Sequence, residues 1–212
     1  MRKQHSLLLI AIIVLTLRSP RASAAPQDCC HSTGHKAEGR DTRANMPAAP
    51  LSLLGTEDLR REFNASSQKV RIVALLSPTC PECQSGHAVV AGILKKFPSP
   101  RLQALLVWEP MRDGDSPAAA AEQAEAVRDA RISQGWDGSH DVGKLFGATL
   151  DLHETAWDVY LIYKPGITWE GLQPPHPTFW MHQLDGADAS LLLCVNPSRL
   201  STEVGKLLDQ PD

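Results

Sequence analysis

A strong charge of either sign is missing from this sequence of 212 residues, whose formal net charge is −3 at pH 7. It has no basic stripe of the kind that binds nucleic acid, so we expect no nucleic-acid partner. Aromatic residues are also scarce, at 5%, while charged residues make up an ordinary 21%. This composition is that of a globular chain and excludes the disordered and fibrous classes. The length fits one domain with flanking segments.

Long apolar runs are missing after the N-terminus, so no later segment is expected to span a bilayer. Near the N-terminus, Arg2 and Lys3 precede an apolar run over residues 6–17, and small residues 22–24 follow it. This order is typical of a secretory signal peptide. We therefore predict that residues 1–24 are removed and that the protein is periplasmic or secreted. The alternative is that the uncleaved segment tethers the protein to the membrane.

Internal repeats are missing as well, and the chain divides by composition instead. Residues 25–50 are rich in Pro, Ala, Gly, Ser and charged residues, without an apolar period. Such a composition predicts a flexible tether. We therefore expect a single folded domain at residues 51–212, behind the signal peptide and the tether.

Four side chains that can bind soft metals or exchange electrons lie in the predicted tether: Cys29, Cys30, His31 and His35. Adjacent cysteines form a mutual disulfide only with strain. The group could instead bind a soft metal ion, pass electrons to another cysteine pair, or have no role. The sequence leaves these three interpretations open.

The cysteine count is odd, at five. Export favours oxidation of thiols, and an odd number leaves at least one thiol unpaired or bonded to another molecule. Cys194 lies in the apolar run Leu191–Val195, a setting in which a free cysteine usually behaves as a small hydrophobe. We therefore predict that Cys194 is a buried free thiol.

Two nearly continuous apolar runs, Val70–Leu76 and Leu102–Trp108, are typical of strands buried on both faces. A helical pattern follows each of them, over residues 89–97 and 117–130. Strand, helix, strand and helix in this order predict an α/β fold with parallel strands. The other predicted elements are helices at Thr56–Phe63 and His140–Phe146, strands at Arg131–Trp136, Trp157–Tyr163, Thr178–Leu184 and Leu191–Val195, and a last helix ending at Leu208.

Cys80 and Cys83 lie between the first predicted strand and the helix that follows it. The first cysteine of such a pair stands at the helix N-terminus, where unpaired backbone amides and the helix dipole favour a thiolate. The second cysteine lies three residues on, on the same helical face, and can close a disulfide. Pro81 suits the first helical turn because it has no amide proton. We therefore predict that Cys80 is the nucleophile and Cys83 the resolving thiol.

This arrangement resembles the thioredoxin superfamily over residues 70–208. The stretches Trp136–Gly138, Val142–Gly147 and Val159–Tyr163 are similar in order to those of its extracytoplasmic thioredoxin-like reductases. The resemblance implies a central mixed sheet flanked by helices, with the Cys-x-x-Cys motif at the N-terminus of the first core helix. It also implies thiol–disulfide oxidoreductase activity on a protein disulfide or dithiol partner, and we expect no organic cofactor.

The resemblance further implies a cis proline at the start of the third strand, facing the dithiol, and this chain departs from that pattern. Threading the strand places Trp157 at the position, and the alternative is Pro177, which precedes Thr178 as in the family motif. The acid that often lies beneath the dithiol is also missing, because Ala74 stands at its place. The neighbours that we expect around the two cysteines are Thr79, Pro81, Glu82, Ala156, Trp157 and Pro177.

Two further acids could lie near the dithiol. Asp158 directly follows Trp157, and Glu109 follows the second strand, at the sheet edge where ligands gather in α/β folds. The commoner outcomes are an ordinary carboxylate at a strand end and a solvated loop acid. We predict the first for Asp158 and the second for Glu109.

Metal binding is the alternative function. Cys80, Cys83 and His87 share one helical face and could supply three ligands for copper or zinc. Copper chaperones of the Sco type share the thioredoxin fold, but their cysteines stand one residue further apart and their histidine is distant in sequence. We interpret His87 as a partly exposed helix residue and thiol–disulfide exchange as the main function.

Overall fold

The computed structural model describes residues 51, 55–184 and 190–210. The predicted signal peptide lies outside the described residues, and so does the predicted tether with Cys29, Cys30, His31 and His35. Within the described part, no helix combines the length and the apolar character needed to cross a membrane.

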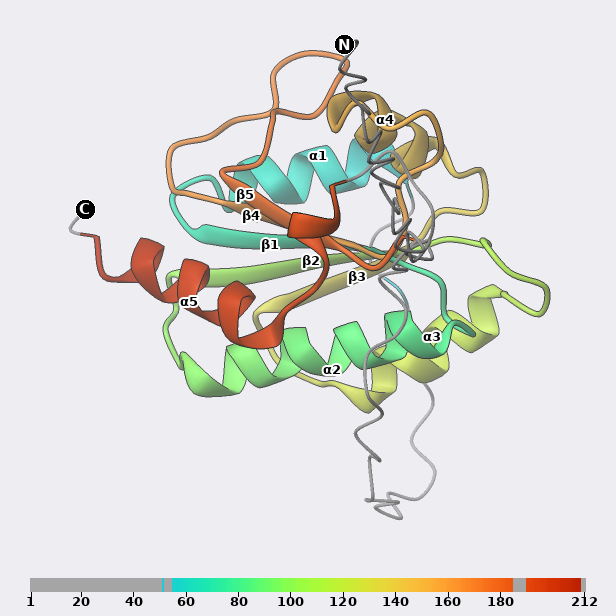
Figure 1. Cartoon of the computed structure of the whole chain (residues 1–212), viewed down its shortest axis with the longest axis horizontal. Helices are drawn as coiled ribbons and strands as arrows, with labels where there is room; N and C mark the ends of the chain where they lie inside the picture. The colour runs from blue at the N-terminus through green and yellow to red at the C-terminus, as the bar shows by residue number, and fades with distance from the viewer. Residues whose placement is uncertain (1–50, 52–54, 185–189, 211–212) are drawn as a thin grey trace, which may run out of the picture.

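A five-stranded mixed sheet forms the centre of the domain (Figure 1). Its strands are β1 (Val70–Leu76), β2 (Leu102–Trp108), β3 (Ile132–Trp136), β4 (Val159–Tyr163) and β5 (Phe179–His182). They lie in the order β3-β2-β1-β4-β5. The three strands β1, β2 and β3 are parallel, whereas β4 is antiparallel to both β1 and β5.

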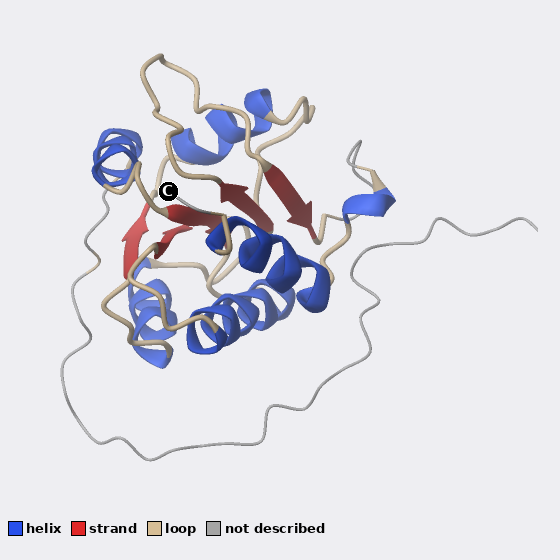
Figure 2. Ribbon diagram, turned by 90° about the vertical axis from the view of Figure 1, so that its left-hand side faces the viewer, coloured by secondary structure: helices blue, strands red, loops and turns tan. Residues whose placement is uncertain are grey.

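Helices cover both faces of this sheet (Figures 1 and 2). The helices are α1 (Thr56–Ala65), α2 (Pro81–Lys96), α3 (Pro117–Ala126), α4 (Asp141–Thr149) and α5 (Pro197–Leu208), with a short 3-10 helix, η1, at Leu191–Leu193. The helices α1 and α4 lie on one face, and α2, α3 and α5 lie on the other. The dithiol follows β1 and lies at the start of α2. The predicted α/β fold, with a central mixed sheet flanked by helices and the Cys-x-x-Cys motif at a helix N-terminus, is therefore confirmed.

The burial of the central strand β1 explains why its sequence, Val70–Leu76, is almost continuously apolar. All seven of its residues are buried. Ile72 and Ala74 belong to the core cluster beneath α2 and α5, whereas Val73 and Leu75 belong to the cluster beneath α1 and α4. Because side chains alternate between the two faces of a sheet, a strand covered on both faces is apolar at nearly every position. The exception is Arg71, whose guanidinium donates hydrogen bonds to three backbone carbonyl groups.

Two predicted elements differ from the structure near their ends. The edge strand expected at Leu191–Val195 is wrong, because these residues form η1 and only a single bridge joins Cys194 to His182. The Ser190 side chain caps η1 by accepting a hydrogen bond from the Leu192 amide, which favours a turn over a strand. The third helix ends at Ala126, before the predicted end, because Val127 adopts an extended backbone.

Candidate functional site

The dithiol lies where the chain passes from β1 into α2. Cys80 is the N-cap residue of α2, with an extended backbone at φ −79° and ψ 121°, and Pro81 occupies the first helical turn. Cys83 lies in the same turn, and both cysteines are free thiols. This placement sets the Cys80 sulfur at the helix N-terminus, whose backbone amides and dipole favour negative charge, while the Cys83 sulfur accepts a hydrogen bond from the Ser77 amide at 3.3 Å.

Asp115 holds the loop that leads into the dithiol. One carboxylate oxygen accepts hydrogen bonds from the Thr79 amide at 2.9 Å and the Thr79 hydroxyl at 2.7 Å. The other accepts from the Ser77 hydroxyl at 2.7 Å and the Arg112 amide at 2.8 Å. Burial acts to raise the pKa of Asp115, but these hydrogen bonds outweigh it and hold the pKa below its ordinary value. Asp115 therefore fixes the backbone just before Cys80. No pattern in the sequence indicated this role.

Replacing Asp115 with Ala is expected to lower the free energy of unfolding by about 1–3 kcal/mol, because four donors lose their acceptor. Asp113→Ala is the matched control, since Asp113 is an exposed acid of the same loop, and its effect should stay within about 0.5 kcal/mol. Urea denaturation of both variants measures the difference. Equal losses in the two variants would contradict the assigned role of Asp115.

The two thiols differ in their environment. Cys83 is fully buried, and burial raises its pKa well above the ordinary thiol value. The pKa of Cys80 lies below that value, chiefly because the Cys83 thiol donates a hydrogen bond to its sulfur. Burial and the Glu82 carboxylate, 3.2 Å from the Cys80 sulfur, oppose this effect. The geometry therefore favours the thiolate on Cys80 and the protonated thiol on Cys83.

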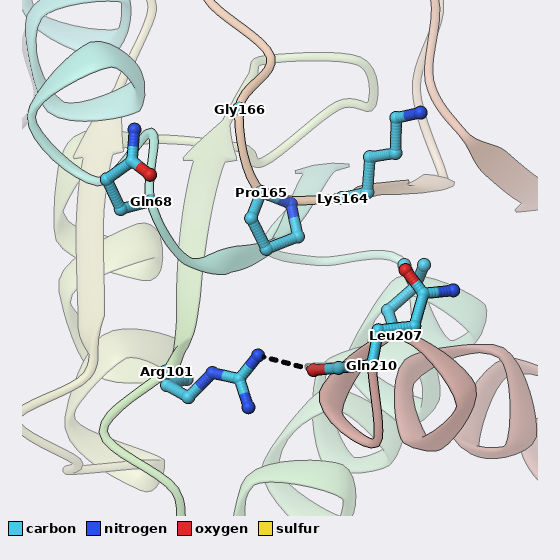
Figure 3. A pocket seen from close by; sticks show the side chains of 7 residues that line it. All are labelled: Gln68, Arg101, Lys164, Pro165, Gly166, Leu207 and Gln210. Atoms are coloured by element: carbon cyan, nitrogen blue, oxygen red, sulfur yellow. Dashed lines mark hydrogen bonds between the residues drawn. The ribbon is translucent and has the colours of Figure 1, made fainter. Parts of the chain in front are cut away.

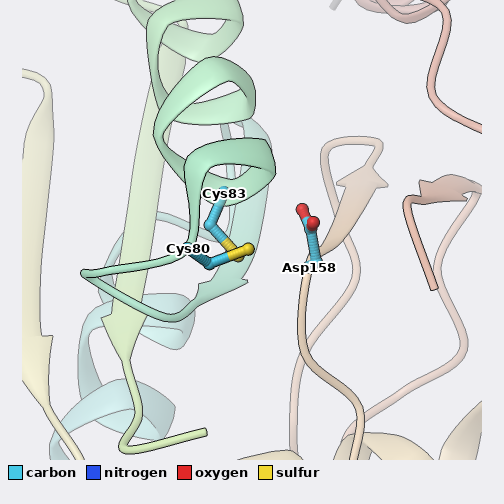
Figure 4. A group of neighbouring side chains, drawn as sticks. All are labelled: Cys80, Cys83 and Asp158. Atoms are coloured by element: carbon cyan, nitrogen blue, oxygen red, sulfur yellow. The ribbon is translucent and has the colours of Figure 1, made fainter. Parts of the chain in front are cut away.

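Asp158 faces the two sulfur atoms from the other side of the site (Figure 4). It directly precedes β4, is only 2% exposed, and adopts a left-handed backbone at φ 52°. One of its carboxylate oxygens and the sulfur atoms of Cys80 and Cys83 all lie within 4.8 Å of one another. Burial raises the pKa of Asp158, and hydrogen bonds from Gln183 and Tyr160 partly offset that effect. Asp158 is thus no ordinary carboxylate at a strand end.

A buried polar network surrounds Asp158. Its Oδ1 atom accepts hydrogen bonds from the Tyr160 hydroxyl at 2.7 Å and the Gln183 side-chain amide at 2.9 Å. The same Gln183 amide group donates to the Glu82 carbonyl oxygen at 2.9 Å. These contacts join the first turn of α2, the start of β4 and the segment after β5 around the dithiol.

The structure separates the two residues considered for the proline position. Trp157 lies one residue before Asp158 and packs, partly buried, against both core clusters. Pro177 precedes β5, whose first residues pair with the far end of β4, so it lies away from the dithiol. The residue directly before β4 is Asp158. No cis peptide bond occurs in the described part of the chain. Among the other expected neighbours, Ala156 is buried and its amide bonds to the Gly143 carbonyl oxygen.

His87 does not join the cysteines. It is 2% exposed, so the prediction of a partly exposed residue is wrong. Its ring packs edge-on against Trp108, with ring centroids 5.1 Å apart. Burial lowers the pKa of His87 to about 4, which keeps the ring neutral. The ligand set of Cys80, Cys83 and His87 is therefore not assembled among the described residues, and Asp158 takes the third place beside the thiols.

Glu109 and Cys194 also differ from their predicted states. Glu109 is fully buried, not solvated, and one of its carboxylate oxygens accepts a hydrogen bond from the Gly143 amide at 2.7 Å. Burial raises the pKa of Glu109 to about 8. Cys194 is disulfide-bonded and only partly buried, so the prediction of a buried free thiol is wrong. Its partner lies outside the described residues.

A pocket of about 530 Å³ lies near the other end of β1, away from the dithiol (Figure 3). The Arg101 guanidinium projects toward the end of α5 and donates hydrogen bonds to the carbonyl oxygens of Leu208 and Gln210. These hydrogen bonds hold the C-terminal end of α5 in place and do not involve the dithiol. The lining residues are Gln68, Arg101, Lys164, Pro165, Gly166, Leu207 and Gln210.

Neither a family model nor a curated protein matches the chain. Solved structures with a similar fold include DsbF from MTB in its mixed oxidized and reduced forms, with 17% identity, a TM-score of 0.44, and coverage of 68% of this chain and 84% of that one. Another is a secreted Mycobacterium tuberculosis disulfide oxidoreductase homologous to E. coli DsbE, with 12% identity, a TM-score of 0.45, and coverage of 68% and 86%. A third is a SCO1/SenC family lipoprotein from Bacillus anthracis str. Ames, with 10% identity, a TM-score of 0.46, and coverage of 69% and 86%.

Proposed function

We propose that this protein is an extracytoplasmic thiol–disulfide oxidoreductase that uses Cys80 and Cys83. The observation that carries the proposal is the asymmetric dithiol at the N-terminus of α2. The Cys83 thiol hydrogen-bonds to the Cys80 sulfur and lowers the pKa of Cys80, while Cys83 itself stays protonated and buried. A thiolate is the attacking species in disulfide exchange, so this asymmetry supports Cys80 as the nucleophile and Cys83 as the resolving thiol.

In the reducing direction, the Cys80 thiolate attacks one sulfur of a partner disulfide. The first partner sulfur leaves with the electron pair of the broken bond, and a mixed disulfide joins the partner to Cys80. Cys83 then loses its proton and attacks the Cys80 sulfur, so the Cys80–Cys83 disulfide forms as the second partner sulfur leaves. The partner gains two electrons that the dithiol loses. The oxidising direction is the reverse of these steps.

Access to Cys80 is restricted in the unbound protein, because only 2% of its surface is exposed. Docking of a partner must therefore open a path to its sulfur atom. The extracytoplasmic part of the proposal is supported by the order of charged, apolar and small residues over positions 1–24. A protein disulfide or dithiol is the partner class that the chemistry favours.

Equilibration with glutathione tests the proposed activity. We expect the purified protein to show a reversible two-electron couple that disappears in Cys80→Ser, since only Cys80 and Cys83 can close this disulfide at the start of α2. A potential of about −270 mV would indicate a reductant, and one of about −120 mV an oxidant.

If no Cys80–Cys83 disulfide forms within this range of reduction potentials, the oxidoreductase proposal is overturned. Cys83→Ser is the second control, because it should stop the reaction at the mixed disulfide and accumulate glutathionylated Cys80. Reduced protein that binds zinc or copper(I) but does not cycle would instead favour the metal-binding alternative.

A further inference from the structure

The buried resolving thiol needs a proton acceptor that β1 does not supply. Cys83 is completely buried, so a base dissolved in water cannot reach its thiol. The β1 sequence VRIVALL contains no carboxylate, and Ala74 lies in the same apolar cluster as both cysteines. A buried thiol without a nearby base holds its proton strongly, since its thiolate would lose hydration. The acceptor must therefore come from another element.

Asp158 is placed to receive this proton. Its carboxylate faces the sulfur atoms from the residue before β4 (Figure 4), and one of its oxygens lies within 4.8 Å of both of them. Interaction with the Cys83 thiol lowers the pKa of Asp158, as it lowers the pKa of Cys80. We propose that Asp158 is a catalytic residue that takes the Cys83 proton as the mixed disulfide on Cys80 is resolved. This inference rests on the proposed oxidoreductase function.

The Cys83 S–H bond breaks and its proton passes to an Asp158 oxygen. The electron pair left on the Cys83 sulfur forms the bond to the Cys80 sulfur, while the bond from Cys80 to the partner breaks. The partner leaves as a thiolate with that electron pair, and the neutral Asp158 carboxyl can then return the proton to it or to water. The two electrons end on the partner.

The surrounding groups keep Asp158 in place and set its acidity. Tyr160 and Gln183 donate hydrogen bonds to it, which favour the charged carboxylate, whereas burial favours the neutral acid. The titratable groups that face it are Cys80, Cys83 and Glu82 of α2 and Tyr160 of β4. Gln183, after β5, is neutral. Opposing influences of this kind suit a group that must both accept and release a proton.

A purely electrostatic role for Asp158 predicts the opposite result from a proton-accepting role. The negative charge of Asp158 raises the pKa values of Cys80 and Cys83. If charge were its whole effect, removing it would increase the thiolate fraction of Cys83 and would speed resolution. If Asp158 accepts the proton, removing it slows resolution even though the thiol becomes more acidic.

The test uses the purified full chain, oxidised glutathione as the probe, and Asp158→Asn. Asparagine is among the residues that best tolerate a left-handed backbone such as that of residue 158. Acid quenching followed by mass spectrometry records how fast glutathionylated Cys80 forms and decays between pH 5 and 9. Formation alone is measured in a Cys83→Ser background.

We expect Asp158→Asn to slow the decay step by roughly 100-fold at pH 7, the lower range for general base catalysis. In the wild type, decay should level off once Asp158 is ionised. In the variant, decay should rise about tenfold per pH unit with the thiolate fraction of Cys83. Formation in the Cys83→Ser background should not slow when Asp158→Asn is added, because loss of the Asp158 charge lowers the pKa of Cys80.

Decay in Asp158→Asn that is equal to or faster than in the wild type overturns the role of Asp158 and leaves the oxidoreductase proposal intact. Absence of glutathionylation and of any Cys80–Cys83 couple in the wild type overturns the proposed function itself.

Tyr160→Phe provides the second variant, in case Asp158→Asn does not fold. It removes one hydrogen bond to the carboxylate, so the inflection in the decay profile should move to higher pH while the plateau is kept. An unmoved inflection in a folded Tyr160→Phe protein also counts against Asp158.

Discussion

Replacing Gly86 with Ala is expected to destabilise the protein by roughly 3 kcal/mol, although alanine is normally the better helix former. Gly86 lies within α2, where a methyl group would overlap the hydroxyl and ring of Tyr160. Tyr160 is completely buried, so its ring cannot move without disturbing the core. The overlap would also push its hydroxyl group from Asp158, leaving a buried carboxylate with one partner fewer.

Gly92 of the same helix provides the matched control. A methyl group added there meets no other atom within 4 Å. Gly92→Ala should therefore raise the free energy of unfolding by about 0.5–1 kcal/mol, the usual gain in a helix. Urea denaturation of the two variants should show changes of opposite sign in the free energy of unfolding, although both are Gly→Ala substitutions in α2. A stabilised Gly86→Ala protein would show that Tyr160 does not pack against α2 as described.

Replacing Glu109 with Gln is expected to remove a large part of the loss of stability with rising pH. Burial raises the pKa of Glu109 from about 4.5 in the unfolded chain to about 8 in the folded one. Between these values the folded chain keeps a proton that the unfolded chain releases, so stability falls as the pH rises. One such group contributes up to about 1.4 kcal/mol per pH unit, or on the order of 5 kcal/mol over the whole interval.

The comparison of Glu109→Gln with the wild type isolates this contribution. Other buried groups act in both directions: the raised pKa of Asp158 has the same sign, while the lowered pKa of His87 makes stability rise with pH below about 6.5. Unfolding free energies from urea denaturation at pH 5, 7 and 9 should diverge, with Glu109→Gln the more stable at pH 9. The exposed acid Glu154 supplies the control, and Glu154→Gln should follow the wild type. Parallel curves for all three proteins would mean that Glu109 is already ionised at neutral pH.

The fold was predictable because its signals are local. A strand covered on both faces must be apolar along its length, and β1 and β2 are the two longest strands of the sheet. The junction of β1 and α2 likewise identified Cys80 and Cys83 without any knowledge of distant contacts. The structure of Leu191–Val195 was harder to predict, because η1 is set by a capping hydrogen bond of Ser190 and not by hydrophobic pattern.

The site was less predictable because it depends on register and on distant contacts. Trp157 and Asp158 are neighbours, and only the pairing of β4 with β1 decides which of them faces the dithiol. Glu109 is buried by α4, whose Gly143 lies 34 residues further along the chain. For His87 a signal did exist. Cys83, His87, Val90 and Leu94 follow helical spacing and are all buried, so this stripe could have placed His87 on the inner face of α2.

The amide group of Gln183 has a consequence for how a partner can bind. It bonds at once to the Glu82 carbonyl oxygen of α2 and to the Asp158 carboxylate before β4. Helix turn, acid and dithiol are thereby braced against each other before any partner arrives. The braced groups lose little conformational freedom on association, so the opening that exposes the Cys80 sulfur must come from other segments. In the proposed exchange, the acid and the helix turn therefore keep their positions while a partner reaches Cys80.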